Sequence, residues 1–337
     1  MNSIICPDGC KIYVFCPGGY ATGGPEALHQ LAHHLIQLGF EAYMYYYSTP
    51  QGQDRVHKNY VKYQVPVVDR PENSRKHLMI VPESFLYPIF NKKFSKIRKA
   101  IWWLSVDYYF IELNKHIERV KNKKFYKIKN ALGLVRIASF GQLKKMDMAH
   151  IGHSWYSMVQ LRENGIEPIG QIADYMNDAF FDEKTSPEKE DIIIYNPKKN
   201  DGFLSGIIGQ TPELVWKPLE DMSPAEVAGW MARAKLYIDF GYHPGKERMP
   251  REACIMRCCM IIGKSGSAAY AEDMPIPDKY RFEKDNDRVP AIIACIKDCL
   301  TNYDERIDDF RLYHDVVCRE KEKFVEDINK VFVKGSK

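Results

Sequence analysis

Short apolar runs alternate along this chain with stretches whose apolar residues recur at helical spacing. The run KIYVFCPGG, at 11–19, ends in a glycine turn, and alanines and leucines then recur every three or four residues up to Gly39. The next apolar run, EAYMYYY, begins at residue 41. Strand, helix and strand in this order predict a βαβ unit in a parallel, doubly wound sheet of the α/β class.

The same alternation extends over most of the chain. Further strands of the first half are predicted at 61–69, 76–84, 96–107, 149–154 and 168–177. Those of the second half are predicted at 191–196, 214–222, 235–240, 258–263 and 275–282, and they precede a long helical stretch at 285–332. Between the halves, the polar run DEKTSPEKED at 182–191 has the composition of a linker. We therefore expect two α/β domains that meet at residue 182.

Charge is distributed unevenly between these halves. The whole chain has a formal charge of +4, but residues 91–145 contain 15 Lys or Arg and 3 Asp or Glu, a balance of +12 that leaves −8 for the remainder. Part of this basic block, 116–145, has a helical pattern. Its apolar positions lie on one predicted face: Phe125, Ile128, Leu132, Val135 and Phe140. A core-facing helix with a solvated side and a segment that binds anionic lipid headgroups both fit this pattern.

Composition excludes several classes of protein. No apolar run approaches the roughly 20 residues that span a bilayer, and the N-terminus has no charged start followed by an apolar core, so we expect a cytoplasmic protein. The nine cysteines are odd in number and form no CxxC pair, which predicts reduced, buried thiols rather than disulfides or a zinc site. The basic block contains no known nucleic-acid-binding module, so no nucleic-acid partner is expected.

The first βαβ unit does not have the fingerprint of an NAD site. Such a site needs the spacing GxGxxG and an acid at the end of the second strand for the ribose hydroxyls. Here the glycines read GGYATGG at 18–24, and the second strand ends in Tyr47, Ser48 and Thr49. NAD is therefore not expected.

Charged residues gather where two strands of the second half end. Lys198 and Lys199 follow one predicted strand, and the run LYIDF ends in Asp239 before the loop HPGKERMPRE. Because the carboxyl ends of parallel strands meet at one edge of a sheet, we expect these side chains to bind one diphosphate ligand, with a solvated basic loop as the alternative. The loop residues assigned to this site are His243, Lys246, Arg248 and Arg251.

A third strand end adds small residues to the same site. Gly266, Ser267 and Ala268 follow the strand predicted at 258–263 and are expected to open a helix, where free backbone N–H groups suit a phosphate. The run Asp285-Asn286-Asp287 has the form of a DxD metal motif, but it precedes a helix and is interpreted as a cap. We therefore expect no metal, so that positive side chains stabilise the ligand's phosphates.

Several segments resemble GT-B glycosyltransferases, in particular bacterial transferases of capsule and O-antigen loci. In chain order they are GGYATGGPEALHQLAHHL, WWLSVDYY, YNPKKN, and YIDFGYHPGKERMPREACIMRCCMIIGKSGSAA with EDMPIPDKY. The loop at 108–145 matches least, where such enzymes differ in acceptor. The resemblance implies two Rossmann-like domains, 1–181 for the acceptor and 182–310 for the nucleotide-sugar donor. It also implies a C-terminal helix, 311–337, that crosses back to the first domain.

The resemblance also assigns a role in donor binding to Glu252. Retaining members carry two glutamates with seven residues between them, and the second opens a helix and contacts the donor ribose. Glu252 fits that second position, but Pro244 stands eight residues earlier in place of an acid. The sequence therefore leaves the sugar-facing acid, and the choice between retaining and inverting chemistry, open.

Acceptor-binding residues are expected in the first half. Gly23 and Gly24 allow close approach of a sugar, although a tight turn explains them as well. The candidates for a base that deprotonates the acceptor hydroxyl are Asp107, which ends a predicted strand and ranks first, Glu26 and His29. His29 is also assigned to acceptor binding. Helix capping by Asp107 and a favourable charge of Glu26 at a helix start are the structural alternatives.

Together these features predict a metal-independent glycosyltransferase of surface polysaccharide synthesis. Its co-substrate is a nucleotide-diphosphate sugar, no cofactor is expected, and the acceptor is a glycan or a lipid-linked glycan. Residues 91–145 place it at the inner face of the cytoplasmic membrane. The alternatives are a sugar-nucleotide epimerase of the same fold and a non-catalytic glycan- or membrane-binding protein on a transferase scaffold. The donor base and sugar, the acceptor and the oligomeric state are not given by the sequence.

Overall fold

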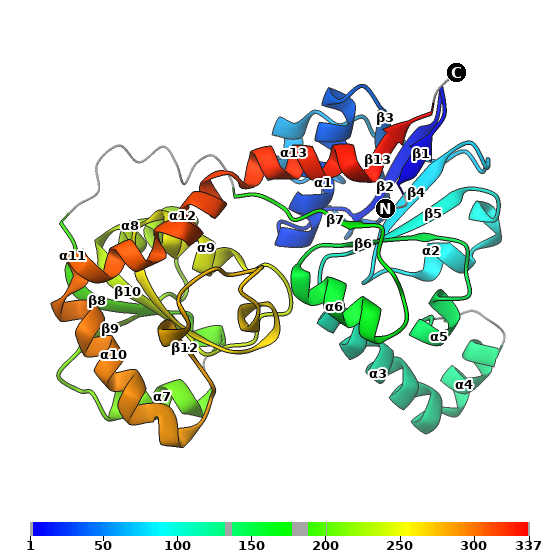
Figure 1. The fold of residues 1–337 in the computed structure, drawn as a ribbon. Coiled ribbons are helices and arrows are strands. Elements are labelled where there is room, and N and C mark those ends of the chain that lie inside the picture. The colour runs from blue at the N-terminus through cyan, green and yellow to red at the C-terminus, as the bar shows by residue number, and fades with distance from the viewer. Residues whose placement is uncertain (1–2, 132–136, 177–187, 200, 336–337) are drawn as a thin grey trace. The chain divides into compact units, whose positions relative to one another are not determined.

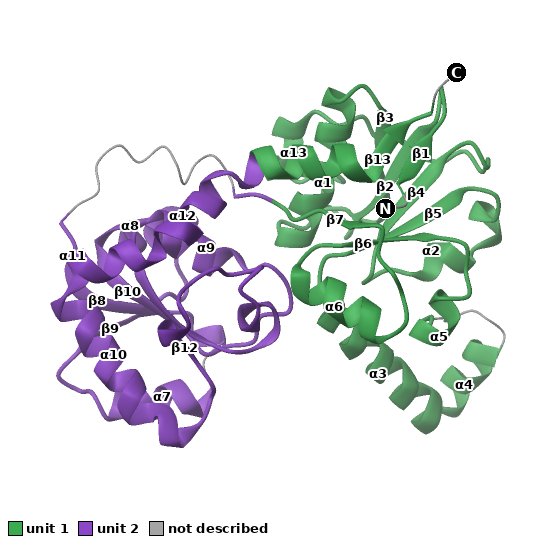
Figure 2. Ribbon diagram, in the orientation of Figure 1, with its two compact units in different colours: residues 1–174, 322–337 green, residues 175–321 purple. Residues whose placement is uncertain are grey.

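The computed structural model describes residues 3–131, 137–176, 188–199 and 201–335 of the chain (Figure 1). These residues form two compact units (Figure 2). Unit 1 comprises residues 1–174 and 322–337, and unit 2 comprises residues 175–321. The boundary expected at residue 182 and most of its linker lie at 177–187, outside the described residues.

Unit 1 is built on a six-stranded parallel sheet with the order β3-β2-β4-β5-β6-β7. Its strands are β2 (Lys11–Pro17), β3 (Glu41–Ser48), β4 (Leu78–Pro82), β5 (Arg98–Trp103), β6 (Ala149–Gly152) and β7 (Gly170–Gln171). The helices are α1 (Gly23–Gln37), α2 (Tyr87–Phe90), α3 (Val106–Asn122), α4 (Lys124–Ala131), α5 (Phe140–Leu143) and α6 (Trp155–Glu163). The chain moves outward in one direction from β2 to β3 and in the other from β4 to β7. Because such crossovers are right-handed, helices cover both faces of the sheet.

The end of the chain belongs to unit 1. Helix α13 (Glu320–Val331) brings Phe324 against the ring of His34 on α1, with ring centroids 5.5 Å apart. Strand β13 (Phe332–Lys334) then pairs in parallel with β1 (Ile4–Cys6). The two ends of the chain are therefore joined in a small sheet of their own.

Unit 2 repeats the doubly wound plan with five parallel strands in the order β12-β11-β10-β8-β9. The strands are β8 (Glu190–Tyr195), β9 (Val215–Pro218), β10 (Ala234–Asp239), β11 (Cys259–Gly263) and β12 (Arg281–Phe282). The helices are α7 (Gly202–Gly209), α8 (Pro224–Arg233), α9 (Arg248–Ile255), α10 (Val289–Thr301), α11 (Tyr303–Arg306) and α12 (Arg311–Cys318). The apolar runs in the middle of the sheet are fully buried on both faces, as expected of parallel strands. The nine cysteines are free, and seven are buried, which agrees with the expected reduced thiols.

The strand predicted at 61–69 is wrong. Residues Lys58–Tyr63 form a 3-10 helix that ends at Gln64, whose φ of 49° lies in the left-handed region. Pro66 has no N–H to donate to a ladder, and only Val67 forms an isolated bridge, to Met44. The segment therefore packs on α1 instead of adding a strand.

Two further predictions need correction. The strand predicted to close on Asp107 ends at Trp103, because the side chain of Ser105 accepts the backbone N–H of Tyr108 and starts α3 there. Asp107 thus lies in the first turn of a helix, as its capping alternative implied. The helix expected to open at Gly266 is a single 3-10 turn, Gly266–Ala269.

The apolar face predicted across 116–145 is divided among separate elements. Phe125 and Ile128 lie on α4, which buries no residue, and they are 70% and 50% exposed. Phe140 lies on α5 and is buried in the core of unit 1. Leu132 and Val135 lie outside the described residues. Within the described ranges, no helix combines the length and apolar character needed to cross a bilayer.

Pairing between β1 and β13 predicts a stability difference between two adjacent residues. Phe332 is buried against Phe40, whereas Val333 is exposed. Phe332→Ala should lower the free energy of unfolding by about 3 kcal/mol, as is usual for a buried Phe, and Val333→Ala by less than about 1 kcal/mol. Urea titration followed by tryptophan fluorescence measures both. Equal losses in the two variants would show that the C-terminal strand does not support unit 1.

Candidate functional site

In the sheet of unit 2, the direction in which successive strands are added reverses between β8 and β10, which are neighbours in space but not in sequence. At such a point the loops after the two strands diverge, and ligands of doubly wound folds bind in the crevice between them. Lys198 and Lys199 follow β8 in a 3-10 turn, and Asp239 is the last residue of β10. The structure therefore brings the two predicted strand ends together.

Lys199 is held at this edge by two contacts. Its Nζ donates to the carbonyl oxygen of Tyr242 at 3.1 Å and lies 2.6 Å from Oε2 of Glu247. Gly241 permits this approach, since a Cβ there would lie 2.5 Å from Cβ of Lys199. Lys198 is exposed, and its backbone N–H donates to the side chain of Asn196. Two cations thus stand at the edge, one fixed by Glu247 and one in solvent.

Asp239 and His243 form the buried part of the site. The carboxylate of Asp239 accepts the hydroxyl of Tyr237 at 2.7 Å and the N–H of Gly241 at 2.8 Å. His243 is fully buried, and its Nε2 lies 3.7 Å from Oδ1 of Asp239. Neither ring nitrogen of His243 has a hydrogen-bond partner among the described residues, and burial lowers its pKa. A buried imidazole without partners is a candidate ligand-binding group, because such nitrogens are rarely left unpaired.

Two of the other predicted cations, Lys246 and Arg251, are engaged by an acid that sequence reasoning missed. Glu320, the first residue of α13, lies 2.7 Å from Nζ of Lys246 and 3.0 Å from Nη1 of Arg251. Arg251 is fully buried and also donates to the carbonyl oxygens of Lys246 and Glu247. Arg251 therefore fixes the loop from inside, and a phosphate contact by it or by Lys246 stays a prediction. Arg248 opens α9 and Glu252 lies in the next turn, both half-buried.

The 3-10 turn Gly266–Ala269 stabilises the loop at 243–247. The backbone N–H of Ser267 donates to the carbonyl oxygen of His243 at 2.9 Å. The hydroxyl of Ser267 donates to the carbonyl oxygen of Gly245 at 2.6 Å. Gly266 has φ +56°, and a Cβ there would lie 2.0 Å from the carbonyl oxygen of His243. Ser267 and its neighbour Ala268 are buried. The segment thus positions His243, and a phosphate contact by Gly266, Ser267 or Ala268 stays a prediction.

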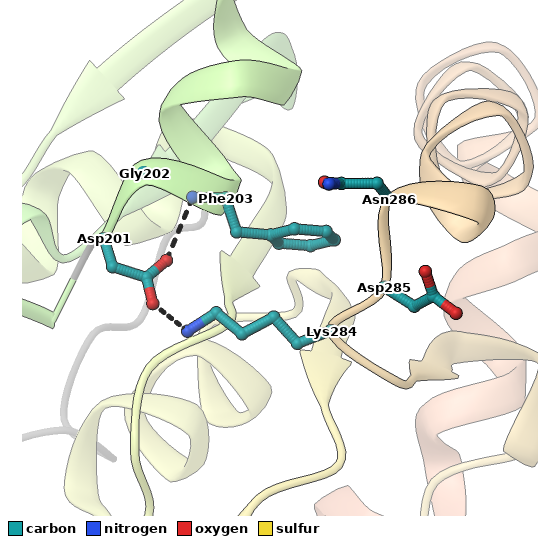
Figure 3. A pocket seen from close by; sticks show the side chains of 6 residues that line it. All are labelled: Asp201, Gly202, Phe203, Lys284, Asp285 and Asn286. Atoms are coloured by element: carbon teal, nitrogen blue, oxygen red, sulfur yellow. Dashed lines mark hydrogen bonds and ion pairs between the residues drawn. The ribbon is translucent and has the colours of Figure 1, made fainter.

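A hollow next to this edge is lined by residues from two strand ends (Figure 3). Phe203, at the start of α7, faces it and packs edge-on against Phe240, which follows Asp239. Lys284 crosses the base of the hollow to form an ion pair with Asp201. Asp285 accepts the N–H of Asp287 at 3.0 Å, so the capping interpretation of the DxD-like run agrees with the structure. In the described part of the chain, no three His, Cys, Asp or Glu side chains are grouped as metal ligands.

In unit 1, two of the predicted acceptor-side residues are part of the packing. His29 donates from Nδ1 to the carbonyl oxygen of Pro25 at 2.6 Å, and its Nε2 lies 2.8 Å from the hydroxyl of Tyr46. Glu26 accepts the hydroxyl of Tyr63 at 3.1 Å. Both side chains are buried on α1, where Gly23 and Gly24 form the first turn. Their predicted roles in acceptor binding are not supported by these contacts and stay predictions.

Asp107 is placed differently. Its Oδ1 accepts the hydroxyl of Tyr156 at 2.7 Å, and its Oδ2 has no hydrogen-bond partner among the described residues. The side chain is buried at the carboxyl end of β5. A carboxylate with one oxygen committed and the other buried without such a partner is a candidate general base or hydroxyl acceptor.

Sequence reasoning missed two acidic groups and a histidine at the same edge of the unit 1 sheet. Glu83 directly follows β4, and its Oε2 accepts the N–H of Leu104 at 2.8 Å. His153 follows β6, and its Nε2 lies 3.2 Å from Oδ1 of Asp174. Each of these residues comes directly after an apolar run, in VPE, IGH and IAD. This position, directly after an apolar run, is the sequence signal that could have identified them.

Burial raises the pKa of Glu83 to about 8, although backbone N–H groups oppose this shift. The folded state therefore keeps its proton up to about pH 8, whereas the unfolded chain loses it near the ordinary value of 4.5. Between these values the folded state binds more protons, so this contribution to stability is complete below pH 4.5 and is lost as the pH rises to 8.

We expect Glu83→Gln to remove this dependence. The free energy of unfolding of Glu83→Gln minus that of the unsubstituted protein should rise between pH 5 and 8, by at most about 1.4 kcal/mol per pH unit. Urea titrations at several pH values measure this difference in the free energy of unfolding. Glu283→Gln, at an exposed position, is the control. Parallel pH profiles of the unsubstituted protein and Glu83→Gln would contradict it.

Comparison with known proteins finds no matching family model and no matching curated sequence. Solved structures do match over almost the whole chain. HepE of Anabaena, determined in complex with UDP-glucose, shares 11% identity, covers 95% of this chain and 97% of its own, and gives a TM-score of 0.60. Sucrose-phosphate synthase of Thermosynechococcus elongatus shares 11% identity over 95% of this chain and 94% of its own, with a TM-score of 0.57.

WaaG, a glycosyltransferase involved in lipopolysaccharide biosynthesis, shares 10% identity over 94% of this chain and 99% of its own, with a TM-score of 0.53. Identities this low establish the fold alone. The two parallel, doubly wound sheets and these matches together show that the chain has the GT-B fold of glycosyltransferases.

Proposed function

We propose that this protein is a glycosyltransferase that moves a sugar from a nucleotide-diphosphate donor to a glycan or lipid-linked glycan of a surface polysaccharide. One observation carries the proposal. The switch point of the unit 2 sheet gathers Lys199, Asp239 and His243, whose ring nitrogens have no hydrogen-bond partner among the described residues, at the place where doubly wound folds bind ligands. HepE, of the same fold, was determined in complex with UDP-glucose, which supports a nucleotide-sugar ligand.

The proposed donor site acts by electrostatic stabilisation of the leaving group. As the bond between the sugar and the diphosphate breaks, negative charge grows on the leaving oxygen, and fixed cations stabilise it. Lys198 is exposed and Lys199 lies beside it at the switch point, so both are assigned to the phosphates. Glu252, on α9, is assigned to the ribose. This arrangement needs no metal ion.

On the acceptor side, Asp107 is assigned as the general base. The acceptor oxygen attacks the anomeric carbon while its proton passes to Oδ2, which has no hydrogen-bond partner among the described residues, and Tyr156 keeps the carboxylate oriented through Oδ1. Glu26 is the weaker candidate because its carboxylate is held by Tyr63.

The α3–α4 segment is proposed to bind an anionic membrane surface. Helix α4 exposes Phe125 and Ile128 among lysines, and Nζ of Lys129 lies 4.6 Å from the ring centroid of Phe125. Exposed apolar side chains surrounded by positive charge suit the boundary between headgroups and acyl chains. A lipid-linked acceptor would be met at that surface, at the inner face of the cytoplasmic membrane.

Two alternatives make different predictions. A sugar-nucleotide epimerase would convert its nucleotide sugar without an acceptor and would form no glycoside. A non-catalytic scaffold protein would keep its glycan or membrane binding in Lys199→Ala. Product NMR with each donor, with and without added glycan, distinguishes these activities from transfer.

Donor binding is tested by titration calorimetry with UDP, GDP, dTDP and CMP. We expect at least one nucleotide diphosphate to bind, and Lys199→Ala to weaken it about tenfold, since a charge-assisted phosphate contact is lost. Lys297→Ala, on the distant helix α10, is the charge-matched control and should bind normally. Binding of no nucleotide diphosphate would rule out the donor site.

Membrane binding is tested by flotation with liposomes. We expect the protein to float with vesicles that contain anionic lipid and not with neutral phosphatidylcholine vesicles. Replacement of lysines 121, 123, 124, 127 and 129 by glutamine should abolish flotation, because each basic residue near an anionic surface contributes about 1 kcal/mol. Flotation that is unchanged in this variant would refute the role of the segment.

A further inference from the structure

Three tyrosines are exposed at the carboxyl edge of the unit 1 sheet. Tyr20 follows β2, Tyr87 begins α2 shortly after β4, and Tyr108 lies in the first turn of α3 after β5. Their exposed fractions are 49%, 44% and 46%. Because β2, β4 and β5 are consecutive in the sheet (Figure 1), the three residues follow neighbouring strand ends.

Two further aromatic residues connect these positions. Tyr47, near the end of β3, stacks on Phe85 with ring centroids 3.6 Å apart and planes inclined by 12°. Phe85 in turn lies 6.4 Å from the ring of Tyr87. Burial raises the pKa of Tyr47, and electrostatic interactions with Cys16, Glu83, Tyr108 and Tyr20 add to this shift. Tyr20 and Tyr108 follow the strands β2 and β5, which flank β4 in the sheet. The residues Tyr20, Tyr47, Phe85, Tyr87 and Tyr108 are here called the aromatic cluster.

The cluster has a particular chemistry. Tyrosine rings offer a flat apolar face with a hydroxyl at the rim, and that combination suits a ligand that is apolar on its face and polar at its edge. Beside Tyr108, Asp107 supplies a buried carboxylate oxygen with no hydrogen-bond partner among the described residues. A carboxylate accepts hydrogen bonds and repels anions, so it favours a neutral ligand that carries hydroxyl groups over a phosphate or a carboxylate. It also disfavours an alkyl chain, which cannot donate to it.

A sugar ring meets these requirements. Its C–H groups form an apolar face, and its hydroxyls lie around the edge, where one can donate to Oδ2 of Asp107. We propose that the aromatic cluster binds a neutral sugar ring of the acceptor, which rests on Tyr20, Tyr87 and Tyr108. Its role as the acceptor rests on the proposed function, whereas binding of the sugar requires no nucleotide.

Saturation-transfer NMR tests the proposal on the full-length protein without nucleotide. The probes are the methyl glycosides of glucose, galactose, mannose, rhamnose and N-acetylglucosamine. At least one should receive saturation at its ring C–H protons. Tyr108→Ala and Tyr20→Ala should weaken that signal about fivefold, and Tyr108→Phe should retain most of it, because the ring face is kept. Leu312→Ala, an exposed apolar position in unit 2, should leave the signal unchanged.

Two results would overturn the proposal. The first is no saturation of any sugar, or an equal signal in the tyrosine variants, whose folding is checked by thermal unfolding. The second comes from octyl glucoside below its micelle concentration, if only the alkyl protons are saturated, since the cluster would then bind a lipid tail. A failure of nucleotide binding in calorimetry with an intact sugar signal would count against the donor site alone.

Discussion

The loop that forms the donor edge depends on one buried guanidinium. Arg251 is sealed from solvent, is paired with Glu320 and donates to the backbone of Lys246 and Glu247. Removing one partner of such a pair costs about 3–5 kcal/mol, because the other charge is left buried and unpaired. The path of residues 243–247, and with it the position of His243, follows from this contact and from the turn at Gly266. Arg251 thus has a structural role: it stabilises the loop that carries the candidate site.

The same sheet plan explains why polar groups gather where they do. In both units all strands of the main sheet are parallel, so every strand ends at the same edge and each following loop begins there. In unit 2 this edge collects Lys199, Asp239 and His243. In unit 1 it collects Glu83, Asp107 and the exposed tyrosines. Buried acids are costly to a fold, and both edges keep them. The edge of unit 2 also keeps a buried imidazole, His243, whose nitrogens have no hydrogen-bond partner in the described part of the chain.

Much of the architecture could be predicted from local pattern. The runs at β2, β4, β8, β10 and β11 are largely apolar, because strands covered by helices on both faces have no solvent side. The start of α8 is also a local pattern, because Ser223 and Glu226 have the spacing of a capping box and form one in the structure. The segment 61–69 looked equally strand-like, but Pro66 and the left-handed Gln64 prevent a ladder there. Ser105 likewise ended a strand that apolar pattern alone extended to Asp107.

The sequence by itself determined the fold class, the repeated βα rhythm and the strand ends at which function should lie, because these depend on residues close together in the chain. Only the tertiary structure decided which charges are available. Glu320 lies 69 residues after Arg251, and their pairing leaves Lys199 and His243 as the clearer donor-side candidates. It also showed that His29 is engaged in packing while Asp107 keeps an open oxygen. Hydrogen-bond partners and burial depend on residues brought together by folding, and local sequence pattern does not record them.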